Sequence, residues 1–160
     1  MEKKYYGDGR LQSVSYFSNN QLLSNQNWLT TGRRTVDSVF YSVDVAPVYK
    51  HIGQDMHGYI RSYIMTSRIP VADLDGTIRV RFVVMEDGSV EGANLITGLR
   101  EDMDNVVLGA IKTMPGNWEP AVLDGEKVRC FITFPVNFHL GAKGRRVDKP
   151  ELPGGILQWQ

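Results

Sequence analysis

The sequence has little of what marks several protein classes. It contains one cysteine, Cys130, so an internal disulfide is impossible. Its 18 basic and 18 acidic side chains give a formal net charge of zero, which provides no general attraction to nucleic acid or to an anionic membrane surface. No run of about 18 apolar residues is present, so no membrane span is predicted. The 160 residues, 42% of them hydrophobic, suit one folded domain with a small appendage.

Candidate catalytic and metal-binding groups are also few. His51 and His57 are not at helical spacing and have no evident third ligand. Cys130 is expected on the apolar face of a strand, where a cysteine behaves as a small hydrophobe. Asp102 and Asp104 stand two apart on an expected helix and so do not face each other. The sequence therefore predicts no enzyme, no cofactor and no metal site.

The first residues do not resemble a targeting signal. Met1–Gly7 contains basic residues, but no apolar stretch follows them as it does in a signal peptide. We expect either a cytoplasmic protein or one from which a leader or membrane anchor has been removed.

Two short strand-and-turn units precede the main domain. The turns are predicted at Asp8–Gly9 and Ser18–Asn20, and the strands at Arg10–Phe17 and Gln21–Trp28. The two units share a rough pattern of turn, polar strand and aromatic residue, which resembles short MORN repeats. The alternative is a β-hairpin that packs against the main domain.

The rest of the chain alternates between strand and helix patterns. Val36–Val45 reads as a strand with Val39, Tyr41, Val43 and Val45 on one side. The further elements expected are a helix over Asp55–Met65 capped by Asp55, a strand over Ile78–Val84, a turn at Glu86–Gly88, a strand over Ser89–Thr97, a helix over Glu101–Met114 and a long strand over Lys127–Leu140.

This order predicts the fold class. Two amphipathic helices and strands joined by hairpins give an α+β domain, with an antiparallel sheet and both helices packed on one face. Pro135 lies in the last strand, and a proline cannot donate to a ladder, so part of that strand is expected at a sheet edge. We expect the boundaries to be 1–35 for the N-terminal strands, 36–140 for the α+β domain and 141–160 for a flexible basic and apolar tail.

Five pieces of the sequence carry a family resemblance. They are Gly76–Val84, Glu86–Val90, Trp118–Ala121, Asp124–Val128 and Phe134–Phe138, in this order and spacing. Together they resemble the C-terminal domain of TonB, the periplasmic energy transducer of Gram-negative bacteria. TonB's membrane anchor and proline-rich spacer do not occur in the sequence. The resemblance thus implies a periplasmic protein whose leader or anchor is missing from this chain.

The resemblance also implies a binding function. TonB C-terminal domains recruit an extended, TonB-box-like segment of an outer-membrane receptor as an added strand, which requires unpaired backbone groups at a sheet edge. The last strand is the candidate edge, and Arg129, Phe131, Thr133 and Asn137 are expected to flank the incoming peptide. The alternative is an envelope scaffold that binds another envelope protein and whose edge is already paired, by residues 10–45 or by the tail.

The tail adds an alternative for assembly. It ends in an apolar stretch with Ile156, Leu157 and Trp159 after a Pro-Gly-Gly hinge. This stretch is predicted either to fold back onto the edge of the last strand or to swap into a neighbouring copy and form a homodimer.

Overall fold

The computed structural model describes residues 1–51, 53–115 and 118–139. The sequence prediction for the tail, 141–160, lies outside these residues. The described elements are β1 (Glu2–Tyr5), β2 (Leu11–Ser18), β3 (Gln21–Asn27), β4 (Val48–Tyr49), α1 (Met56–Ser67), β5 (Gly76–Val84), β6 (Val90–Thr97), α2 (Glu101–Lys112), β7 (Trp118–Glu119), β8 (Ala121–Leu123), β9 (Glu126–Val128) and β10 (Cys130–Phe138).

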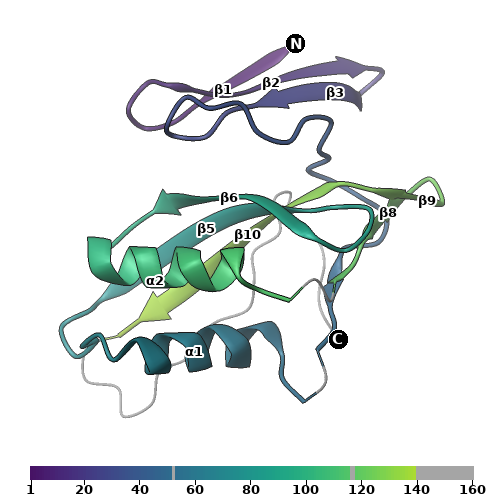
Figure 1. Cartoon of the computed structure of the whole chain (residues 1–160). Helices are drawn as coiled ribbons and strands as arrows, with labels where there is room; N and C mark the ends of the chain where they lie inside the picture. Colours follow the sequence, from purple (N-terminus) through teal and green to yellow (C-terminus); the bar gives the residue numbers. More distant parts are fainter. Residues whose placement is uncertain (52, 116–117, 140–160) are drawn as a thin grey trace.

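The predicted fold class is confirmed. A central antiparallel sheet has the strand order β10-β5-β6, and α1 and α2 both cover one of its faces (Figure 1). The main core lies between the helices and this face. Its fully buried members include Ile60, Phe82, Met103, Ile111 and Phe134. Among the described residues, no helix is both long and apolar enough to cross a membrane.

The helix termini follow from local chemistry. The Asp55 side chain accepts a hydrogen bond from the Gly58 N–H at 2.7 Å, which confirms Asp55 as the N-cap of α1. At the other end, Arg68 adopts a left-handed φ of 58°, and its N–H bonds back to the Met65 carbonyl. Pro70 follows two residues later and prevents the helix from continuing.

The N-terminal strands form a separate sheet in the order β1-β2-β3. Both predicted turns are present, and Asn19 and Asn20 take the positive φ values that a two-residue hairpin turn requires. The sheet lies over the face of the central sheet opposite the helices (Figure 1). Its inner side carries buried polar residues, namely Ser13, Ser15, Asn25 and Asn27. This agrees with a hairpin packed on the main domain, while a relation to MORN repeats stays a prediction.

The predicted strand over Val36–Val45 is wrong. The segment bends at Ser38, Tyr41 and Asp44, and its backbone bonds change partner along its length. The Ser38 N–H bonds to the Asn25 carbonyl, the Phe40 N–H to the Arg129 carbonyl and the Val45 N–H to the Val122 carbonyl. Three different partners cannot form one ladder, so only isolated bridges result.

The predicted single strand over Lys127–Leu140 is also wrong, because the chain changes partner at Arg129. Before this residue, β9 pairs with β8 in a short hairpin whose turn contains Asp124 and Gly125 at positive φ. After it, β10 pairs with β5 along its whole length. Leu140 lies outside the described residues.

Candidate functional site

The last strand forms one edge of the central sheet. β5 pairs with one side of β10, and no other named strand of the described chain pairs with its second side. The backbone contact on that second side comes from Phe40, which bonds to the Arg129 carbonyl at 2.9 Å and accepts from the Phe131 N–H at 3.1 Å. The position of Pro135 in an edge strand agrees with the sequence prediction.

The direction of the Phe131 N–H sets the direction of the groups that follow it. Because this N–H points away from β5, alternation along a strand directs the N–H and C=O of Thr133 to the same open side. Pro135 is the next residue with this orientation, and it offers a carbonyl but no N–H. At the open edge, Thr133 therefore offers its N–H as a donor and its C=O as an acceptor, whereas Pro135 offers its C=O alone.

Of the four residues predicted to flank a partner, the first two in the chain have contacts around the start of β10. The Arg129 Nε donates to both carboxylate oxygens of Glu86 at 2.9 and 3.1 Å, and its Nη1 donates to the Asp37 carbonyl at 3.2 Å. Phe131 is 3% exposed and lies under the Tyr41 ring, with ring centroids 4.7 Å apart.

The other two residues lie farther along the edge strand. Thr133 is half-buried and stands opposite Arg81 of β5. Asn137 is half-buried as well, and its side-chain oxygen accepts a hydrogen bond from the Thr77 hydroxyl. The contact of all four residues with a partner stays a prediction.

Arg81 is a residue of this region that the sequence analysis did not single out. It lies on β5, on the face turned toward the N-terminal sheet, and its guanidinium lies 4.7 Å from the Phe131 ring centroid. The sequence did contain a signal for its position. Arg81 stands between Val80 and Phe82 of the main core, so its side chain must point to the opposite face of β5. Its burial was not predictable, because it arises between segments far apart in the chain, as in the contact with Phe131.

Cys130 is a buried residue at the start of β10. Cys130 is 2% exposed, and desolvation by burial raises the pKa of its thiol to about 12, so the thiol stays protonated at neutral pH. Among the described residues, no group of three His, Cys, Asp or Glu side chains is arranged to hold a metal ion.

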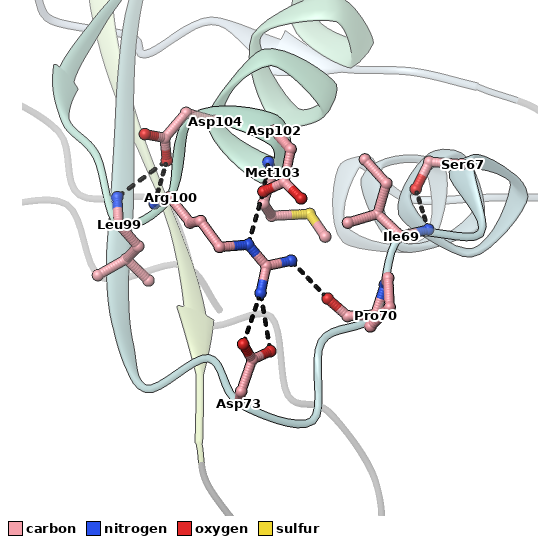
Figure 2. A network of polar contacts seen from close by, with 9 residues as sticks. All are labelled: Ser67, Ile69, Pro70, Asp73, Leu99, Arg100, Asp102, Met103 and Asp104. Atoms are coloured by element: carbon pink, nitrogen blue, oxygen red, sulfur yellow. Dashed lines mark hydrogen bonds and ion pairs between the residues drawn. The ribbon is translucent and has the colours of Figure 1, made fainter.

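The two carboxylates near the start of α2 take part in different contacts (Figure 2). Asp104 accepts from the Leu99 N–H at 2.9 Å, while Asp102 pairs with the Arg100 Nε at 2.6 Å. Arg100 also pairs with Asp73 at 2.7 Å and donates to the Pro70 carbonyl, so it joins the chain before β5 to α2. These carboxylates stabilise the fold and do not form an acid–base pair.

The Arg100 contacts predict a pH-dependent stability. Hydrogen bonds from Arg100 lower the pKa of Asp73 and of Asp102 below the ordinary value of 3.8. A lowered folded-state pKa contributes stability above the ordinary pKa, and this contribution is lost as the pH falls through the folded-state pKa. Arg100→Gln should therefore be less stable than wild type at pH 7, and the difference should shrink below about pH 4.

Urea unfolding at pH 7 and pH 3 measures this difference. The matched control is Arg61→Gln, since Arg61 is exposed on α1 and has no ion pair with the described residues. The control should leave the urea midpoint unchanged at both pH values. An Arg100→Gln deficit of equal size at pH 3 and pH 7 would contradict the role of the two carboxylates.

A comparison with known protein families found a match, which lies in the second half of the described chain. Residues 71–140 match the model of the Gram-negative bacterial TonB protein C-terminal family. The match includes β5, β6, α2 and all later strands, whereas α1 and the N-terminal sheet precede it. Comparisons with curated proteins and with solved structures found no match. Domains of this family are periplasmic, and they bind proteins rather than catalyse reactions. Residues 71–140 are thus similar to the TonB C-terminal family, and α1, which precedes them, completes the core that they form.

Proposed function

We propose that the chain is a periplasmic TonB-like binding module. It recognises an extended segment of an outer-membrane receptor, which adds as a new strand beside β10, and this binding is linked to energy-dependent transport. The observation that supports the proposal is the edge position of β10, with the backbone groups of Thr133 directed away from β5. Main-chain hydrogen bonds at such an edge supply affinity for an extended peptide.

The chemistry of the edge indicates a modest affinity. Phe40 already uses the Phe131 N–H, and Pro135 has no N–H, so the Thr133 N–H is the donor between them. One partner carbonyl opposite Pro135 gains no hydrogen bond from β10 in this arrangement. Each net hydrogen bond stabilises a complex by about 0.5–1.5 kcal/mol, so a ladder with this gap favours weak, reversible binding.

A second function is supported by the contact at Phe40. This residue pairs with the start of the β10 edge, where an added strand would otherwise begin. The alternative proposal is therefore an envelope scaffold, in which the chain's own residues occupy the edge and a different surface binds another envelope protein.

A proline substitution at the edge tests the first proposal. Thr133→Pro removes the outward N–H, and it leaves the bonds between β10 and β5 in place because the groups that face β5 belong to the neighbouring residues. We expect Thr133→Pro to weaken peptide binding about tenfold or more, from a lost hydrogen bond and a steric block. Thr133→Val keeps the N–H and the branched shape, so it should bind within about twofold of wild type.

The measurement is a titration with TonB-box-like peptides from outer-membrane receptors, followed by backbone amide NMR. Shifts that cluster on residues 131–138 are expected in wild type and Thr133→Val. Thermal unfolding of each variant checks that the fold is intact. Equal binding by the proline and valine variants, or the absence of any shift on β10 at millimolar peptide, would contradict strand addition and favour the scaffold.

A further inference from the structure

The central strand contains a buried arginine without a carboxylate partner. Arg81 is 9% exposed, and the described chain gives it no ion pair. Its Nε is fully buried and has no hydrogen-bond acceptor. Its guanidinium lies over the Phe131 ring, 4.7 Å from the ring centroid. Because a buried charge is costly unless it is paired, this environment favours binding of an anionic group.

The position of the guanidinium indicates where that anion would come from. Arg81 stands opposite Thr133 of β10, in the kind of pair that has no hydrogen bonds between its two residues and in which side chains approach most closely. Its guanidinium extends from β5 over Phe131, which is also on β10. The guanidinium therefore lies against a side chain of the edge strand.

A strand added beside β10 would place its side chains within reach. Neighbouring strands lie about 4.8 Å apart, so an added strand would run about 4.8 Å beyond β10. Alternate side chains of that strand point to the same face as Thr133 and Arg81. An aspartate or glutamate at one of these positions would lie on the same face as the guanidinium, where a carboxylate can form a charge-assisted hydrogen bond with it.

The neighbouring arginines are already engaged. Arg129 is bonded to Glu86 and to the Asp37 carbonyl, and Arg79 of the same face also has an interaction within the chain. Arg81 is the cation of this face that combines deep burial with an unused Nε.

From this geometry we infer that the partner segment carries a carboxylate on the side that faces the N-terminal sheet, and that Arg81 selects it. The inference rests on the proposed strand addition and names the chemistry of the partner. The backbone edge of β10 supplies sequence-independent affinity, and Arg81 adds the preference for an acidic residue at one position.

A paired peptide scan tests the inference. Each position of a TonB-box-like receptor peptide is replaced in turn by glutamate and by glutamine, which have nearly the same shape. Wild type should prefer glutamate about tenfold at one position, as for a charge-assisted hydrogen bond. In Arg81→Met, whose side chain still covers the Phe131 ring, the glutamate and glutamine peptides should bind with about equal affinity. The affinity for the glutamine peptide should be the same as in wild type. In Arg81→Lys, which keeps the charge, part of the preference should remain.

The outcomes separate the inference from the proposed function. If peptides shift the β10 amides but no position prefers glutamate, or if Arg81→Met keeps the preference, strand addition stands and the role of Arg81 is wrong. If no peptide shifts the β10 amides of wild type, both are wrong. Loss of the preference at high salt in wild type, with unchanged binding of the glutamine peptides, would further support a charged contact.

Discussion

Replacing Gly88 by alanine should destabilise the folded chain by about 3 kcal/mol or more, since two separate costs add. Gly88 lies in the turn between β5 and β6 at a φ of +83°, where an L-residue costs about 1–2 kcal/mol. A Cβ at this position would stand 2.2 Å from the Trp118 carbonyl oxygen. This oxygen belongs to the backbone of β7, so it cannot swing away as a flexible side chain can, and the overlap adds about 1–3 kcal/mol.

Gly125→Ala is the matched control for this substitution. Gly125 has a φ of +80° in the turn between β8 and β9, but nothing lies within 4 Å of its Cβ position. It should therefore show only the cost of the backbone conformation, about 1–2 kcal/mol. Urea unfolding of both variants gives the two free energies. Similar values for the two alanine variants would mean that the close approach of Gly88 to β7 is not a feature of the folded protein.

Replacing Asn25 by alanine should have the second large effect, about 3 kcal/mol, because it leaves two buried backbone groups unpaired. The Asn25 side chain accepts from the Val39 N–H at 2.9 Å and donates to the Val39 carbonyl. Val39 is completely buried, so water cannot replace either bond. Asn25 thus joins the N-terminal sheet to the segment that contacts the edge of β10 through Phe40.

Gln26→Ala serves as the control for Asn25→Ala. Gln26 is the next residue of β3, so its side chain points to the opposite face of the N-terminal sheet. The control should change stability by less than about 0.5 kcal/mol. Hydrogen exchange of the Phe131 amide gives a local readout, because its acceptor is the Phe40 carbonyl. Slow exchange at Phe131 in Asn25→Ala would contradict the proposed link between the two segments.

The N-terminal sheet also changes the surroundings of the central sheet. It covers the face of the central sheet that the helices leave open, and a second small core of Val39, Val83 and Phe131 forms beneath it. Phe131 packs against Tyr41, and Arg81 lies over the Phe131 ring, while Thr133 stays half-buried at the edge. The packing of Phe131 on this face therefore depends on Tyr41, a residue outside the part that matches the family.

Local patterns in the sequence predicted the central fold because neighbouring residues cause those patterns. The alternation in Ile78–Val84, the stripe of Met103, Val107 and Ile111, and the Asp55 cap each depend on groups within a few residues. The edge position of the last strand was also within reach, since Pro135 has no N–H to donate to a ladder.

The sequence by itself determined the α+β core and its turns, since periodicity, caps and turn residues act over short distances. The order and spacing of five short motifs carried the resemblance to the family that residues 71–140 match. The tertiary structure alone decided the division of the last strand at Arg129, the bridge from Phe40 and the burial of Arg81. Each of these arises between segments far apart in the chain, where a residue's backbone bonds go to whichever strand packing brings beside it. No local pattern of side chains encodes that choice.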